Sequence, residues 1–203
     1  MRNILFATLL LIVTLSFTTG DKKMSGENGK LSGVVTYKDY YYESSYHADA
    51  GSEIYAISEA DLKSTKYADL SDVIENFQRN KAGYSLARYN TLDISRIIQL
   101  QNNFDTSSKY TLNYINGFRK MRTVITASTN GQGNYTLSLR PGRYCILVIS
   151  GNIKSNNILE SKGNLEYKIA NIKSAGETNL DVNFEKTENI MIMLMTAVQR
   201  EGC

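Results

Sequence analysis

The sequence predicts a mainly β protein, folded as a β-sandwich, with helices inserted between two of its strands. Strand-length apolar segments, some alternating with polar residues and some uninterrupted, lie on both sides of a central region. That region, from Glu59 to about Met121, instead has apolar residues at helical spacing. The 203 residues, 42% hydrophobic and 21% charged, suit one domain with an insertion or one and a half domains.

The clearest strand signals surround a turn in the second half of the chain. Asn130, Gly131 and Gly133 mark this turn, because Asn and Gly adopt positive φ at little steric cost. Apolar and polar residues alternate in the strand that follows, Asn134–Leu139. We expect this strand to pair across the turn with a strand at Thr123–Ser128.

A second turn follows directly. Pro141 fixes φ and Gly142 supplies the left-handed residue, so together they favour a tight reversal of the chain. The next residues, Tyr144–Ile149, form a continuous apolar run of strand length. Such a run is typical of a strand buried on both faces.

These residues also carry a resemblance. The pattern T-N-G-x-G-x-Y-x-L-x-L-x-P-G-x-Y resembles carboxypeptidase regulatory-like domains, and so do the upstream pieces Lys30–Tyr37 and Ala48–Ile57. The resemblance implies a transthyretin-like (prealbumin-like) Greek-key β-sandwich, common in secreted and surface proteins of Bacteroidetes-like bacteria. It implies a non-enzymatic module and leaves the function open, since such domains occur on many different proteins.

The remaining strands are expected on either side of the helical region. Leu31–Tyr37 is the first strand, with Gly33 marking a bulge or a close approach of another backbone. The other expected strands are Ser52–Ile57, the alternating residues Leu165, Tyr167 and Ile169, the alternating residues Leu180, Val182 and Phe184, and a closing strand at Ile190–Val198.

The helical region contains two or three apolar stripes. They comprise Leu70, Val73, Ile74 and Phe77, then Ile94, Ile97, Ile98 and Phe104, then Leu112, Ile115, Phe118 and Met121. We expect breaks at Gly83 and at Asp105–Ser108. We expect the helices to cover the sheet as a docked cap, with a projecting, partner-binding arm as the alternative.

The N-terminus predicts export. Arg2 precedes the apolar run Ile4–Val13, and small residues follow up to Gly20, as in a signal peptide spanning residues 1–20. The apolar run is shorter than a membrane span requires, so we expect no transmembrane segment in the mature chain. Residues 21–29 are expected to be a flexible tether and 30–203 the domain. The expected location is periplasmic, cell-surface or extracellular.

The residue types argue against catalysis and against cofactors. His47 is the single histidine, which removes two-histidine metal sites and most proton relays. We therefore expect no catalytic residues, no cofactor and no metal. No clustered basic face predicts nucleic-acid binding. We expect Cys145 and Cys203 to be free thiols, with a disulfide as the alternative.

The best candidate for ligand binding is a tyrosine-rich loop containing Tyr40, Tyr41, Tyr42 and Tyr46. Tyrosine offers a flat apolar face and a hydroxyl group, which suit stacking on a sugar or a peptide. The alternative is a hairpin in which tyrosine simply fits the pleat. The leading hypothesis is a secreted, non-enzymatic binding or assembly module with protein or glycan partners at the cell envelope. The alternatives are a carbohydrate-binding module and an accessory domain of a hydrolase system.

Overall fold

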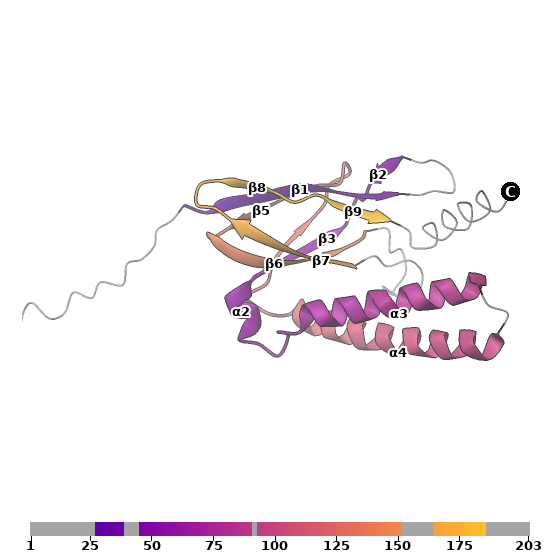
Figure 1. The fold of residues 1–203 in the computed structure, drawn as a ribbon. Coiled ribbons are helices and arrows are strands. Elements are labelled where there is room, and N and C mark those ends of the chain that lie inside the picture. Colours follow the sequence, from indigo (N-terminus) through magenta and orange to yellow (C-terminus); the bar gives the residue numbers. More distant parts are fainter. Residues whose placement is uncertain (1–26, 39–44, 91–92, 152–164, 186–203) are drawn as a thin grey trace, which may run out of the picture.

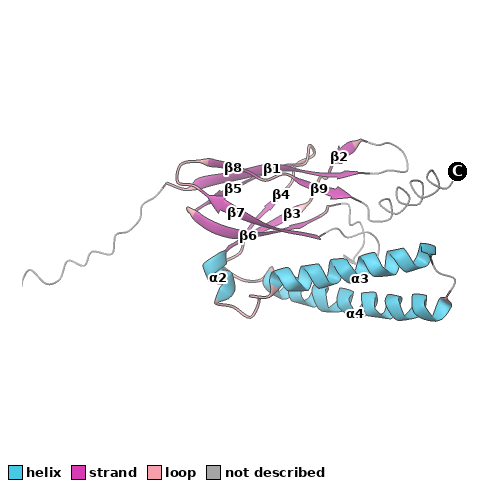
Figure 2. Cartoon of the chain, viewed as in Figure 1, coloured by secondary structure: helices cyan, strands magenta, loops and turns pink. Residues whose placement is uncertain are grey.

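Two β-sheets face each other, and helices lie along the outer face of one of them (Figures 1 and 2). This computed structural model describes residues 27–38, 45–90, 93–151 and 165–185. The first sheet is built around β1 (Gly29–Lys38), with β5 (Asn134–Leu139) and β2 (Tyr46–Ala48) on one side and β8 (Glu177–Asn179) and β9 (Val182–Glu185) on the other. The second sheet has the order β4 (Ile125–Ser128), β3 (Glu53–Ser58), β6 (Gly142–Ile149), β7 (Leu165–Ile172). The predicted β-rich body with inserted helices is confirmed.

Strand β6 is covered on both faces, by the first sheet on one side and by the helices on the other. All six residues of Tyr144–Ile149 are buried, as predicted. Ile146 and Val148 pack between the two sheets, with Leu31, Val35 and other residues of the sandwich core. Their neighbours Cys145, Leu147 and Ile149 belong to a second core that includes residues of the helices. The uninterrupted apolar run therefore reflects cover on both faces of the sheet.

The helices follow β3 directly. They are α2 (Glu59–Lys63), α3 (Leu70–Asn90) and α4 (Ile94–Phe118). The Asp93 side chain caps α4 by accepting a hydrogen bond from the Arg96 backbone N–H. Figure 1 shows α3 and α4 side by side beneath the second sheet, with their far ends extending past it.

Both predicted helix breaks are wrong. Helix α3 runs through Gly83, because a single glycine costs a helix only about 1 kcal/mol and this helix is 21 residues long. Helix α4 runs through Asp105–Ser108. There the Ser107 hydroxyl donates a hydrogen bond of 2.9 Å to the Phe104 carbonyl, so this polar side chain is satisfied within the helix.

The predicted pairing of residues 123–128 with 134–139 is also wrong. Strand β4 pairs with β3 and strand β5 pairs with β1, so the turn carries the chain from one sheet to the other. The Asn130 side chain accepts hydrogen bonds from the backbone N–H groups of Gln132 and Asn134, which tightens the turn. Gly133 has φ 77° and lies so close to β1 that an added Cβ would be 2.4 Å from the Val35 carbonyl oxygen.

The second predicted turn, at Pro141 and Gly142, also carries the chain from one sheet to the other. Pro141 precedes Gly142, which has φ 150°, and the chain passes there from β5 in the first sheet to β6 in the second.

The close approach predicted at Gly33 is confirmed, since a Cβ at this position would be 2.1 Å from the Leu180 carbonyl oxygen. Leu180 lies at the interruption between β8 and β9. Glycine in β1 therefore lets the last described strands follow it closely.

Candidate functional site

The α3–α4 hairpin has two halves with different surroundings. The docked half comprises residues 70–77 and 104–118, and it supplies most helical residues of the core beneath the second sheet. Four apolar residues of α3 predicted to form one stripe are buried here: Leu70, Val73, Ile74 and Phe77. On α4, Ile115 and Phe118 have no exposed surface. This half is a structural cap on the sheet.

A polar contact fixes the end of the docked half. Arg119, which follows α4, donates hydrogen bonds of 2.8 and 2.6 Å to the two carboxylate oxygens of Glu53 in β3. Its guanidinium group lies 5.2 Å from the centre of the Tyr55 ring. Burial raises the pKa of Tyr55, and its hydrogen bond to Glu53 raises this pKa further. The helix end is therefore held to β3 through Arg119, which contacts both Glu53 and Tyr55.

The distal half, residues 78–103, is mostly exposed. Ala87 is the one buried side chain among those the structure describes there. Large apolar side chains remain in solvent: the exposed fractions are 47% for Leu86, 70% for Ile94 and 52% for Ile98. These exposed apolar side chains make the distal half a candidate interaction surface.

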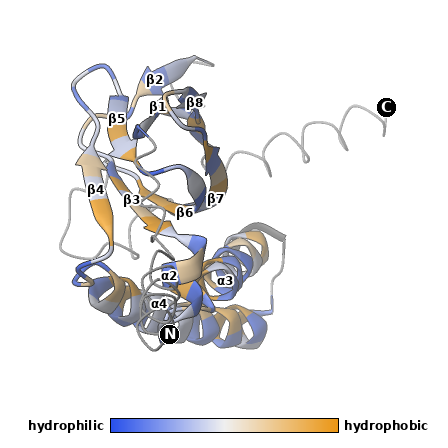
Figure 3. Ribbon diagram, turned by 90° about the vertical axis from the view of Figure 1, so that its left-hand side faces the viewer, coloured by the Kyte–Doolittle hydropathy of each residue, from blue (hydrophilic) through white to orange (hydrophobic). Residues whose placement is uncertain are grey.

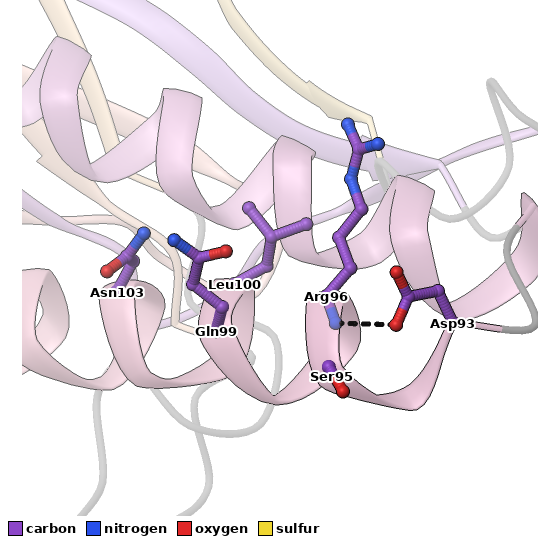
Figure 4. Close-up of a pocket in the computed structure, with 6 residues that line it drawn as sticks. All are labelled: Asp93, Ser95, Arg96, Gln99, Leu100 and Asn103. Atoms are coloured by element: carbon purple, nitrogen blue, oxygen red, sulfur yellow. Dashed lines mark hydrogen bonds between the residues drawn. The ribbon is translucent and has the colours of Figure 1, made fainter.

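A groove of about 480 Å³ lies along α4 in the same half. Figure 4 shows its six lining residues: Asp93, Ser95, Arg96, Gln99, Leu100 and Asn103. Most are polar, and they come from successive turns of one helix. The groove offers hydrogen-bond donors and acceptors to another molecule.

The tyrosine-rich loop is described only in part. Tyr40, Tyr41 and Tyr42 lie outside the described residues. Tyr46, in β2, is 48% exposed, and the Lys38 ammonium group lies 5.4 Å from the centre of its ring. On the same pair of strands, the rings of Tyr37 and His47 are 5.5 Å apart.

Cys145 is a free, buried thiol. The Tyr167 hydroxyl donates a hydrogen bond of 3.0 Å to its sulfur, and burial raises the pKa of the thiol. A buried cysteine with a raised pKa is a poor nucleophile, which favours a structural role. Cys203 lies outside the described residues, so the pairing of the two cysteines stays a prediction.

A buried polar cluster, which no sequence pattern predicted, lies where the ends of the two sheets meet. The Asp49 backbone carbonyl accepts hydrogen bonds from the hydroxyls of Ser52 and Thr129, at 3.0 and 2.6 Å. Its carboxylate accepts one from the Ser150 hydroxyl. Asp49 has no exposed surface, so the cluster joins the ends of β2, β3, β4 and β6 from within.

Within the four described stretches, no group of three His, Cys, Asp or Glu side chains is placed to hold a metal ion. The helices that the structure describes include none with the length and apolar character needed to cross a membrane.

Comparisons with known proteins give distant likenesses alone. No protein-family model and no curated protein matches the chain. Among solved structures, PA1324 of Pseudomonas aeruginosa, a candidate carbohydrate-binding protein, is 11% identical, with a TM-score of 0.40 over 77% of this chain and 88% of that one. The minor pilin GBS52 of Streptococcus agalactiae is 16% identical, with a TM-score of 0.34 over 75% of this chain and 49% of that one.

The pilus backbone protein RrgB of Streptococcus pneumoniae is 11% identical, with a TM-score of 0.27 over 75% of this chain and 40% of that one. This chain therefore spans half or less of either pilin. Likenesses of this size carry no argument about function, which has to come from the residues of the chain itself.

Proposed function

We propose that this chain is an exported, non-enzymatic binding or assembly module of the cell envelope. In this proposal the body is a transthyretin-like Greek-key sandwich of the carboxypeptidase regulatory-like kind. The distal half of the α3–α4 hairpin then binds a protein partner. The observation that carries the proposal is the contrast between buried and exposed residues along one pair of helices.

A partner that covered the exposed apolar residues of the distal half would gain free energy from their burial. Ile94 and Ile98 lie one helical turn apart on α4, so together they form a short apolar stripe. Arg96 and Gln99 lie nearby on the groove. An apolar stripe with polar groups beside it matches the apolar centre and polar rim of protein–protein interfaces. The partner expected is therefore a folded protein with its own apolar patch.

Site-specific photo-cross-linking in the producing cell tests this function. A benzophenone amino acid at Ile98 should give a discrete cross-linked product with one envelope protein. The same group at Asn113, exposed on the docked half of α4, is the matched control and should not give that product. Adding Ile94→Glu should remove the product. A product of equal yield from both positions, or no product from Ile98, would contradict the proposal.

A second candidate is carbohydrate binding at Tyr46. The motivating observation is its half-exposed ring beside the Lys38 ammonium group, an arrangement that suits stacking on a sugar. Affinity electrophoresis in soluble polysaccharides compares wild type with Tyr46→Ala. A mobility shift that Tyr46→Ala abolishes supports this candidate, and identical mobility of both proteins in every polysaccharide removes it.

A further inference from the structure

Charge is unevenly distributed along the sequence of the α3–α4 hairpin. The distal half has one acidic residue, Asp93, and its basic residues are Arg79, Lys81, Arg88 and Arg96. The docked half has the opposite excess, since its one basic residue is Lys109 and its acidic residues are Asp72, Glu75 and Asp105. The whole chain has a net charge of +3, which equals the excess of the distal half, so the rest of the chain is balanced.

Local partners compensate some of these charges but not that of Arg96. Arg79 forms an ion pair of 2.6 Å with Glu75, one helical turn before it. Asp93 caps α4 by accepting a hydrogen bond from the Arg96 backbone N–H. Figure 4 shows this bond at the base of the Arg96 side chain and the guanidinium group at its far end. Among the residues that the structure describes, no carboxylate forms an ion pair with this guanidinium group.

Arg96 begins a row of hydrogen-bond donors along the groove. Gln99 follows Arg96 by one helical turn and Asn103 follows Gln99 by another, so the three side chains lie on one side of α4. Figure 4 shows the amide groups of Gln99 and Asn103 next to each other. A guanidinium group followed by amide N–H groups suits a carboxylate, because a carboxylate only accepts hydrogen bonds.

The groove and the apolar stripe belong to one exposed surface. Successive residues of a helix are about 100° apart, so Ser95 and Gln99 lie between Ile98 and Arg96 around the circumference of α4. All four of these side chains are exposed. A partner that covered Ile98 and continued around the helix would therefore meet the groove.

We propose that the groove binds glutamate or aspartate side chains and that the partner of the distal half is an acidic protein surface. That the partner is a protein rests on the function proposed above, whereas the preference for carboxylates rests on the residues of the groove. A second copy of this chain is a poor partner, because two distal halves would bring like charges together.

An anionic membrane also fits the distal half less well. Helices that lie in a membrane surface combine an apolar face with a face rich in lysine and arginine. Figure 3 shows short hydrophilic and hydrophobic segments mixed along α3 and α4. The distal half has more amide residues than basic ones, among them Gln99, Gln101, Asn102 and Asn103. Amide groups recognise a partner by the geometry of their hydrogen bonds, which a protein surface can match.

Titration of the isotope-labelled chain with triglutamate, followed by nuclear magnetic resonance, tests the groove by itself. Backbone amide signals of Arg96, Gln99 and Asn103 should shift with triglutamate and stay unchanged with triglutamine. Arg96→Glu should weaken the binding by about fivefold or more, because it replaces attraction by repulsion. Lys109→Glu makes the same change of net charge at an exposed residue of the docked half, so it should bind as wild type does.

The photo-cross-link from Ile98 tests the partner. Its yield should fall by about fivefold or more with Arg96→Glu and stay the same with Lys109→Glu. An unchanged yield with Arg96→Glu would overturn the acidic partner and leave the proposed function in place. No product from the wild-type background would remove the proposed function and the protein partner together, and the triglutamate titration would still decide the chemistry of the groove.

Two further results would overturn the proposal. One is the absence of triglutamate shifts at the groove, or equal shifts with triglutamine, because the groove would then have no preference for carboxylates. The other is co-sedimentation with phosphatidylglycerol vesicles that Arg96→Glu abolishes. That result would assign the groove to lipid phosphates instead of an acidic protein.

Discussion

The two halves of the α3–α4 hairpin differ in burial although the apolar stripe runs through both. On α4, Phe104, Ile115 and Phe118 are buried, whereas Ile94 and Ile98 are more than half exposed. The residue types are equivalent, so the difference comes from where the sheet ends beneath the helices (Figure 1). The comparison shows that an apolar stripe indicates the capacity to pack and that the neighbouring layer determines whether packing occurs.

The largest expected effect breaks the docked half. Phe118→Ala removes a side chain with no exposed surface, so it should lower the free energy of unfolding by about 3–5 kcal/mol. Ile98→Ala, on the same helix, should change it by about 0.5 kcal/mol or less. Urea denaturation measures both. Equal losses for the two variants would show that the distal half is packed as firmly as the docked half.

The sequence predicted which strands and helices are buried better than it predicted which strands pair with each other. The patterns at Leu31–Tyr37, Tyr144–Ile149 and Leu70–Phe77 identified buried strands and a helix, because burial on one or both faces imposes a periodicity on the residues. Pairing was predicted wrongly around Asn130. Its short turn signal is compatible with a hairpin and with a crossing between sheets, and the choice depends on distant contacts such as Gly133 against Val35.

The candidate sites were less predictable. The exposed stripe of Ile94 and Ile98 has the same pattern as a buried one, so periodicity alone could not separate docked cap from projecting arm. The Asp49 cluster has no local pattern, since its partners Thr129 and Ser150 are 80 and 101 residues away in the chain. The tyrosine-rich loop stays a prediction: Tyr46 is half exposed, and Tyr40, Tyr41 and Tyr42 lie outside the described residues.

A second prediction concerns the turn that joins the two sheets. Gly133 has positive φ, and in Gly133→Ala the new Cβ would lie 2.4 Å from the Val35 carbonyl oxygen. We therefore expect this substitution to lower the free energy of unfolding by about 1–3 kcal/mol. Gly131→Ala is the control, since an added Cβ there meets nothing within 4 Å. Thermal denaturation compares the two. If Gly131→Ala were as destabilising as Gly133→Ala, the turn geometry would be wrong.

A third prediction concerns how the stability of the sandwich body depends on pH. Burial raises the pKa of Tyr135 in β5 above its ordinary value of 10.0. The folded state thus favours the neutral form of Tyr135. The contribution of this residue to the free energy of unfolding is complete below pH 10 and declines as the pH rises further. At pH 11 the loss should be roughly 1 kcal/mol. Tyr135→Phe should flatten this part of the pH profile; an unchanged profile would contradict the assignment.

The smallest effect is expected from truncating the distal half. Removing residues 81–100 and joining Asn80 to Gln101 through a short Gly-Ser turn deletes mostly exposed surface. The free energy of unfolding should change by about 1 kcal/mol, because the main packing lost is the stack of the Tyr84 ring on the Phe104 ring. Denaturant unfolding and light scattering measure the result. An insoluble or strongly destabilised product would mean that the distal half supports the sandwich.

Native-state hydrogen exchange along α4 tests the central claim most directly, because both halves are then compared within one helix of one unaltered protein. Amides of residues 104–118 should exchange with opening free energies close to that of global unfolding. Amides of residues 97–103 should open at distinctly lower free energy, beyond the fraying of the first turn. Uniform protection from Ile97 to Phe118 would contradict the division into a docked half and a projecting half.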